Sequence, residues 1–202
     1  MTSLVRWLAV ADVDPGWRSV LDDGERERLA AKSGPEEQAR FVGAAALMRR
    51  VVGELAGCDP ADVGLRRDCP DCDLPHGRPV PTGAAQGWHV SASHSGPHVL
   101  VAASARSVGV DVELVRSRPP SAALVARVVS PGEAEPADAE GFARLWAAKE
   151  AYLKALGTGL ALPMSSVRVA EDRAVLLDGS APEGRLERLD APAGAVAWVC
   201  LT

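Results

Sequence analysis

The chain has 202 residues, of which 47% are hydrophobic and 24% charged, so it can bury one large core or two smaller ones and is not disordered by composition. Its net charge is −5 and its basic residues are scattered, which excludes a general nucleic-acid binder, because such a protein needs a concentrated basic face. The apolar runs are short and no signal-type stretch follows Met1, so we expect a cytoplasmic protein outside the membrane.

Two helices are predicted in the first sixty residues. From Pro35 to about Gly57, apolar side chains recur at three- and four-residue steps and form one apolar stripe. Pro35 suits the first turn of this helix, and Gly57 suits its end. The shorter, charged stretch from Asp22 to Lys32 is also predicted to be helical.

Residues 59–87 are rich in Pro, Gly, Asp and Cys and predict a long irregular excursion. Within it, Cys69-Pro-Asp-Cys72 and the following His76 have the look of metal ligands. A structural zinc site normally closes with four ligands, however, and the other two cysteines of the chain are isolated. Two reduced thiols in a rigid loop are therefore the favoured interpretation, and zinc is the alternative.

Three β-strands are predicted next, at residues 88–91, 98–103 and 107–113. In the last one, valines alternate with Gly109, Asp111 and Glu113, so the two carboxylates project from one face of the strand. Paired carboxylates suit Mg²⁺, which is usually held by a few carboxylates together with phosphate oxygens. On this pair alone, a solvated face of an edge strand is the simpler interpretation.

The second half of the chain predicts helices at residues 122–129 and 140–156. Short β-like runs follow at residues 166–170, 174–177 and 195–201. Helices and strands in this half roughly echo those of the first. We therefore expect an α+β protein of two similar halves, residues 1–105 and 106–202, although no repeat is visible residue by residue.

The second of these helices carries three side chains spaced by four residues, Trp146, Glu150 and Lys154, which stack on one side. A glutamate four residues before a lysine is by itself an ordinary surface pair. Here the pair leads into the glycine-containing stretch 157–163. A cation, a carboxylate and a glycine turn could together hold a metal-bound pyrophosphate.

Ser93-His94-Ser95-Gly96 is predicted to lie at a turn between two strands, where the hydroxyls and the imidazole could contact phosphate oxygens. A Ser-His-Asp hydrolase is the competing enzymatic hypothesis. No serine lies in a Gly-x-Ser-x-Gly elbow, and adjacent residues of an extended backbone point to opposite faces, which is poor geometry for activating a nucleophile.

At these residues the sequence resembles the 4′-phosphopantetheinyl transferases of the surfactin type. Five motifs occur in the family's order over about residues 22–165. They are His-Gly-Arg-Pro at 76–79, where the family has Gly-Lys-Pro, then Ser-His-Ser at 93–95, Gly-Val-Asp-Val-Glu at 109–113, Trp-Ala-Ala-Lys-Glu-Ala-Tyr-Leu-Lys at 146–154 and Gly-Thr-Gly-Leu-Ala-Leu-Pro at 157–163. Each motif alone is weak, and together they make coincidence improbable.

The resemblance implies a pseudo-dimeric fold of two α+β lobes with the active site in the cleft between them. It implies that Asp111, Glu113 and Glu150 bind Mg²⁺ together with the pyrophosphate of coenzyme A. Lys154 would reach a pyrophosphate oxygen, and Glu150, directly or through a water, would take the proton of the attacking serine.

The resemblance also assigns coenzyme A contacts to the N-terminal half. Ser93, His94 and Arg78 would contact the adenosine and 3′-phosphate end, and Arg28 and Arg40 match the family's 3′-phosphate residues by spacing. Asp111 and Lys154 of the C-terminal half would complete the set. Ser91 departs from the family, which usually has asparagine there.

The implied reaction is Mg²⁺-dependent transfer of 4′-phosphopantetheine from coenzyme A to a serine of an apo acyl or peptidyl carrier protein, releasing 3′,5′-ADP. The expected pathways are polyketide or nonribosomal peptide synthesis, and the expected enzyme is a monomer. The carrier helix would dock around residues 122–129. An inactive coenzyme A-binding protein and a structural zinc-binding interaction module are the alternatives.

Overall fold

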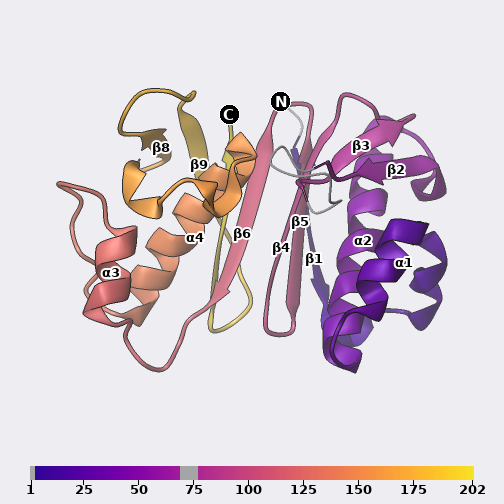
Figure 1. Ribbon diagram of the computed structural model, residues 1–202, viewed down its shortest axis with the longest axis horizontal. Helices are drawn as coiled ribbons and strands as arrows, with labels where there is room; N and C mark the ends of the chain where they lie inside the picture. The colour runs from indigo at the N-terminus through magenta and orange to yellow at the C-terminus, as the bar shows by residue number, and fades with distance from the viewer. Residues whose placement is uncertain (1–2, 69–76) are drawn as a thin grey trace. The chain divides into compact units, whose positions relative to one another are not determined.

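The computed structural model describes residues 3–68 and 77–202 and divides into two compact units, Met1–Arg106 and Ser107–Thr202 (Figure 1). Each unit combines helices with antiparallel strands, which confirms the predicted α+β fold class. The proposed zinc ligands Cys69, Cys72 and His76 lie outside the described residues. None of the helices in the described ranges is long and apolar enough to cross a lipid bilayer.

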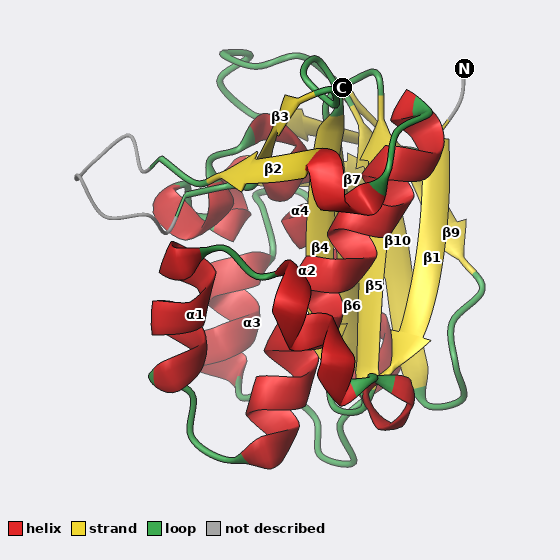
Figure 2. Ribbon diagram, turned by 90° about the vertical axis from the view of Figure 1, so that its right-hand side faces the viewer, coloured by secondary structure: helices red, strands yellow, loops and turns green. Residues whose placement is uncertain are grey.

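The first unit is built around one three-stranded antiparallel sheet in the order β1-β5-β4, with a separate two-stranded sheet, β2-β3 (Figure 2). Its elements are β1 (Ser3–Ala9), α1 (Asp23–Ala30), α2 (Pro35–Ala56), β2 (Val63–Arg66), β3 (Val80–Gly83), β4 (His89–Ser95) and β5 (His98–Ser104). Short 3-10 helices lie at Val10–Asp12, Pro15–Val20 and Pro60–Asp62.

Helix α2 supplies most of the helical side of this core. Pro35 occupies its first turn, and Gly57 ends it in the left-handed conformation, with φ at 68°. Its buried Met48 and Val52 pack against the sheet, where Val99 and Val101 are fully buried. The predicted helix from Pro35 to about Gly57 is confirmed.

The shorter helix α1 is attached to α2 by a buried ion pair. Asp22 and Glu25 form a capping box at the start of α1. Arg49 of α2 then donates to both carboxylate oxygens of Glu25, at 2.8 and 3.2 Å. Glu25 and Arg49 are almost completely buried, so each charge depends on the other.

In this unit two predictions are wrong and one strand was missed. Strand β1 was not expected, and β2 and β3 lie inside the stretch 59–87 that was predicted to be irregular. β2 and β3 are only four residues long, and Pro81 lies within β3, so their local signal resembles that of a turn. The Ser-His-Ser segment belongs to strand β4, and the turn comes one residue later, at Gly96.

The second unit contains a five-stranded antiparallel sheet in the order β6-β10-β9-β8-β7. Its elements are β6 (Val108–Leu114), α3 (Ala122–Val128), α4 (Ala139–Leu156), β7 (Val167–Ala170), β8 (Arg173–Leu176), β9 (Gly184–Leu189) and β10 (Ala195–Leu201), with 3-10 helices at Gly159–Ala161 and Met164–Ser166. The helices predicted at 122–129 and 140–156 are confirmed within one residue. Strand β9 was missed, because its alternating Arg and Glu conceal the single buried Leu186.

Helix α4 lies on the sheet so closely that one position of β6 tolerates no side chain. A Cβ atom on Gly109 would collide with the carbonyl oxygen of Ala151 and with the backbone nitrogen of Ala155. On another side of α4, the fully buried Tyr152 donates its hydroxyl to the carbonyl of Pro182 at 2.8 Å. The close approach at Gly109 fixes the distance of α4 from the sheet.

Candidate active site

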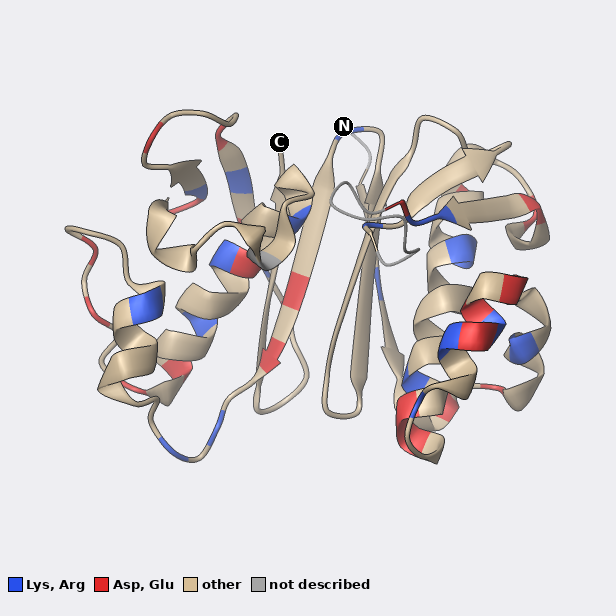
Figure 3. Ribbon diagram, in the orientation of Figure 1, with Lys and Arg blue, Asp and Glu red and all other residues tan. Residues whose placement is uncertain are grey.

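The packing of α4 on β6 brings the acidic strand against the charged side of the helix (Figure 3). Gly109, Asp111 and Glu113 share one face of β6, because side chains of a strand alternate between faces. Gly109 meets α4 near its C-terminal end, and Asp111 meets Lys154. Ser107, just before β6, donates its hydroxyl to the carbonyl of Ala155, whereas Glu113 near the other end of β6 lines a cavity with Trp146. Strand and helix therefore run in opposite directions.

Asp111 and Lys154 are in direct contact. The Nζ of Lys154 donates to Oδ1 of Asp111 at 2.6 Å. The Asp111 side chain is almost entirely buried, whereas 26% of the Lys154 side chain is exposed. About a quarter of the lysine side chain is thus open to solvent beside the buried carboxylate.

Glu150 lies one helical turn before Lys154 and is only 8% exposed. Burial raises the pKa of Glu150 above its usual range, the Lys154 ammonium opposes this shift, and the Asp111 carboxylate adds to it. Glu150 and Asp111 are thus close enough for their charges to repel. Two neighbouring carboxylates beside an ammonium are suited to accepting a proton and to holding a divalent cation.

Because the pKa of Glu150 is raised, the stability of the folded protein depends on pH. In the metal-free protein the folded state holds the Glu150 proton more tightly than the unfolded state does, so the ionised carboxylate lowers stability once the pH exceeds its raised pKa. Glu150→Gln is therefore expected to melt higher than wild type at pH 7 in EDTA. The difference should shrink as the pH falls through the raised pKa and vanish below the usual pKa of glutamate. Thermal unfolding at pH 7 and pH 4 tests this, and equal melting temperatures at pH 7 would contradict it.

The donor set fits a magnesium ion that is shared with a substrate. Among the residues that the structure describes, no three His, Cys, Asp or Glu side chains are grouped so as to hold a metal ion alone. Mg²⁺ commonly takes one or two carboxylates and completes its shell with water and phosphate oxygens, and Asp111 and Glu150 supply such a pair. Glu113 as a third ligand stays a prediction.

The indole N–H of Trp198, a residue close to Asp111, is a further polar group, and no sequence motif indicated it. Trp198 stands opposite Asp111 in the β6–β10 register. Within the described part of the chain its indole Nε1 is buried and has no hydrogen-bond acceptor. An isolated tryptophan in a strand carries no sequence signal for such a position, so sequence reasoning could not find it.

Glu113 lines a cavity of about 370 Å³. Its walls include the apolar side chains of Leu124 and Trp146, and Arg116 and Arg118 lie in the segment that borders it. The predicted docking helix α3 therefore forms one wall of a pocket that also contains a predicted metal ligand.

In the first unit, Arg78 is held by a histidine that sequence reasoning passed over. Nη2 of Arg78 donates to Nδ1 of His89 at 2.9 Å, and since arginine has no acceptor this imidazole nitrogen must be unprotonated. Burial and the Arg78 charge lower the pKa of His89, which keeps the acceptor available. Burial also lowers the pKa of Arg78.

Ser93 and His94 point to opposite faces of β4. Ser93 is buried, and His94 is exposed on the face whose other residues, Val90 and Ala92, pack toward the α2 core. A ligand that contacts both side chains must therefore reach around the edge of this strand.

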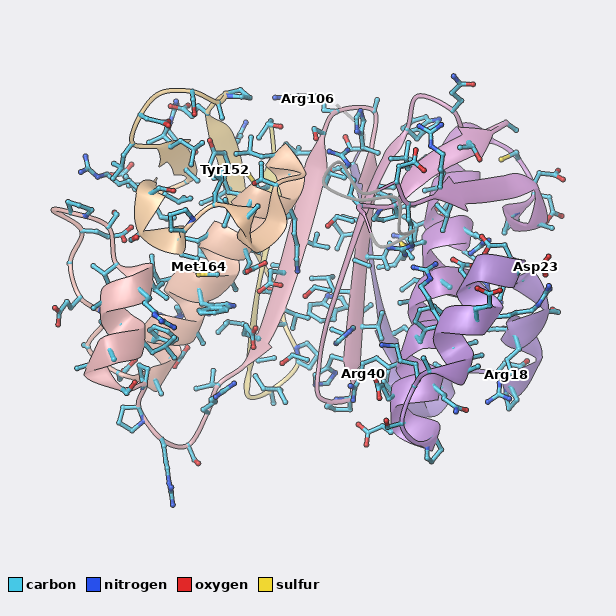
Figure 4. All side chains as sticks on the ribbon, in the orientation of Figure 1. Arg18, Asp23, Arg40, Arg106, Tyr152 and Met164 are labelled. Atoms are coloured by element: carbon cyan, nitrogen blue, oxygen red, sulfur yellow. The ribbon has the colours of Figure 1, made fainter. Side chains whose placement is uncertain are left out.

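The remaining predicted arginines have separate neighbours. Arg28 lies over the ring of Phe41, 5.6 Å from its centroid, while Arg40, labelled in Figure 4, pairs with Glu36 at 2.7 Å. Arg67, which no motif indicated, has its pKa lowered to about 10 by burial and by the charge of Arg28. Arg28 and Arg67 are therefore neighbouring like charges, an arrangement that a bound anion would relieve.

Comparison with known proteins shows what the chain is similar to. Residues 107–183 match the model of the 4′-phosphopantetheinyl transferase superfamily. A 4′-phosphopantetheinyl transferase of Bacillus subtilis is 29% identical over 189 residues, covering 80% of this chain and 79% of the relative. HetI of Nostoc is 31% identical over 137 residues (63% and 55%), and Sfp of Bacillus subtilis strain 168 is 33% identical over 99 residues (45% and 43%).

The chain is similar to the 4′-phosphopantetheinyl transferases, to the superfamily model over residues 107–183 and to the first Bacillus subtilis relative over 80% of its length. It is an enzyme of that class. The segment that matches the superfamily contains β6 and α4, and hence Asp111, Glu150 and Lys154. The residues that meet on these two elements thus lie within the matched segment.

Proposed function

We propose that this phosphopantetheinyl transferase is of the surfactin type and moves the 4′-phosphopantetheine arm of coenzyme A to a serine of an apo acyl or peptidyl carrier protein. The observation that carries the proposal is the meeting of Asp111, Glu150 and Lys154 between β6 and α4. The proposal includes a monomeric, cytoplasmic enzyme that serves polyketide or nonribosomal peptide carriers, with the substrate arm or the carrier helix entering beside α3.

In the reaction, the serine oxygen of the carrier bonds to the β-phosphorus of coenzyme A, and the bond from that phosphorus to 3′,5′-ADP breaks. Glu150, directly or through a water, accepts the serine proton. Lys154 neutralises charge on the pyrophosphate. Asp111 and Glu150, with Glu113, would hold Mg²⁺, which when bound supplies further positive charge to the phosphate oxygens.

The first unit would bind the part of coenzyme A that does not react. Arg28 and Arg78 are the proposed ligands of the 3′-phosphate, and Arg67 joins them here because its charge already lies beside that of Arg28. Arg40, Ser93 and His94 remain proposed contacts at the same end of the ligand.

The decisive experiment is incubation of the protein with coenzyme A, Mg²⁺ and an apo carrier protein. Intact-mass measurement should show the carrier gaining one phosphopantetheinyl group. EDTA should stop the reaction, and Mg²⁺ or Mn²⁺ should restore it. Binding of coenzyme A without any mass gain would instead favour the inactive binding protein. Activity that follows zinc content and is lost in the Cys69→Ser/Cys72→Ser variant would favour a zinc-dependent protein.

Arg78→Ala is expected to raise KM for coenzyme A roughly ten- to hundredfold, since a charge-assisted hydrogen bond contributes about 1.5–3 kcal/mol. The 3′-phosphate does not react, so kcat should change little. KM for dephospho-coenzyme A should be nearly unchanged by the substitution, because the partner of Arg78 is already missing. Steady-state kinetics of both proteins with both substrates measures this coupling.

Arg26→Ala is the matched control for Arg78→Ala. Arg26 is an exposed arginine that pairs with Asp23 within α1, so its loss should leave both KM values unchanged. No coupling between Arg78 and the 3′-phosphate would remove Arg78 from the proposed site.

A further inference from the structure

Lys149 immediately precedes Glu150 in α4, but its side chain enters the core of the second unit. It is completely buried. Its ammonium group donates to the carbonyl of Val128 at 2.6 Å, to the carbonyl of Met164 at 3.3 Å and to Oε2 of Glu133 at 2.6 Å. All three hydrogens of the ammonium group are therefore used, each by a different segment of the chain.

Both carboxylate oxygens of Glu133 also accept hydrogen bonds. Its Oε1 accepts the backbone N–H of Val169 at 3.0 Å, and its Oε2 also accepts the backbone N–H and hydroxyl of Ser130, at 3.0 and 3.2 Å. Burial alone would raise the pKa of Glu133, but the hydrogen bonds from Lys149 and these other donors lower it, so the carboxylate stays ionised. The result is a closed network around one buried ion pair.

The segments joined by this network border the candidate active site. Val128 is the last residue of α3, which forms a wall of the cavity that Glu113 also lines. Met164, labelled beside α4 in Figure 4, directly follows the glycine-containing stretch 157–163. Both segments are tied to α4 at the residue next to Glu150.

A buried ion pair is a weak source of stability, because removing two charges from water costs about as much as their attraction returns. Hydrophobic residues of similar size could fill the same space without that cost. What they would not supply is a directed link to two backbone carbonyls and a backbone N–H. The geometry therefore points to a role in positioning rather than in stability.

We propose that Lys149 and Glu133 are positioning residues of the transferase: their ion pair holds the end of α3 and the end of the 157–163 stretch against α4, and so fixes the surroundings of Glu150 and Lys154. This inference rests on the proposed function. Neither side chain touches the substrate, so their effect passes through the segments that they hold.

The test uses the double variant Lys149→Met/Glu133→Leu. Lys149→Met alone would leave a buried, unpaired carboxylate and is expected to unfold the unit, whereas removal of both charges leaves an apolar pair that the core accommodates. We expect the double variant to fold but to melt below wild type, because the backbone groups that the ion pair satisfied lose their partners. Its kcat should fall roughly ten- to hundredfold, because small displacements of reacting groups have effects of that size. KM for coenzyme A should change far less.

Tyr152→Phe is the matched control. It removes a buried hydrogen bond between the same helix and a backbone carbonyl, that of Pro182, without touching the two segments in question. Its kcat should equal that of wild type. Amide hydrogen exchange provides a second measurement, and residues 128–133 and 157–164 should exchange faster in the double variant only.

A double variant with wild-type kcat, or with no more loss than Tyr152→Phe, would overturn the inference and leave the proposed function standing. A wild-type protein that transfers nothing to any carrier would overturn the proposed function instead. In that case amide hydrogen exchange of the double variant still tests the network. Faster exchange at residues 128–133 and 157–164 would support it, and unchanged exchange would overturn it.

Discussion

Asp111→Asn is expected to lower kcat for phosphopantetheinyl transfer roughly 10²–10³-fold, the usual effect of removing one group that stabilises charge in a transition state. The substitution keeps the shape of the side chain but removes the anion that holds Lys154 and one of two neighbouring carboxylates. Stability should stay close to wild type. The amide oxygen of the asparagine can still accept from Lys154, and loss of the Asp111 charge relieves the repulsion on Glu150.

Steady-state kinetics in buffer with limiting Mg²⁺, together with thermal unfolding, measures both effects of Asp111→Asn. Glu187→Gln is the control, since Glu187 is an exposed carboxylate on β9 of the same sheet. It should leave kcat and melting temperature unchanged. Wild-type turnover by Asp111→Asn would remove this carboxylate from the proposed metal site.

Gly109→Ala is expected to destabilise the second unit by about 3 kcal/mol or more, because the added methyl group has no free space. The atoms that it meets belong to the backbone of α4 at Ala151 and Ala155, so no side-chain rotation can relieve the collision. For a unit of this size the loss corresponds to a fall in melting temperature of roughly 12–24 °C. In the fraction that still folds, α4 would be displaced from β6, and Lys154 would move with it.

Gly24→Ala is the opposite case and serves as the control for Gly109→Ala. Gly24 lies in α1, where the nearest atom to an added Cβ would be Oδ1 of Asp22 at 3.5 Å, an ordinary contact. Alanine is the better helix former by about 1 kcal/mol, so this variant should melt at or above the wild-type temperature. Similar melting temperatures for the two variants would show that α4 can move away from β6.

Elements with a strong local pattern could be predicted from the sequence. Helices α2 and α4 carry long apolar stripes with glycine at their ends, and β6 alternates over its whole length. Strands β1 and β9 depend on partners that are distant in sequence or on a single buried side chain, and local patterns do not contain that information. This is why the errors fall on short or charged strands.

The candidate site could be predicted in part. Strand periodicity indicated that Asp111 and Glu113 share a face, and helical spacing grouped Glu150 with Lys154. That this strand face is covered by α4, rather than solvated, depends on the absence of a side chain at Gly109. The buried Lys149–Glu133 network lies beyond motif reasoning, because the sequence cannot show which of two adjacent charged residues turns inward.

The strand order of the second unit determines when the site can form during synthesis. Strand β6, which carries Asp111, pairs with β10, and residues 115–194 separate the two. A newly made β6 therefore emerges long before its partner, and closing so long a loop delays the pairing. The β4–β5 hairpin of the first unit forms between neighbouring segments. Newly made chains should thus complete the first unit early, and transferase activity should appear only after β10 has joined the sheet.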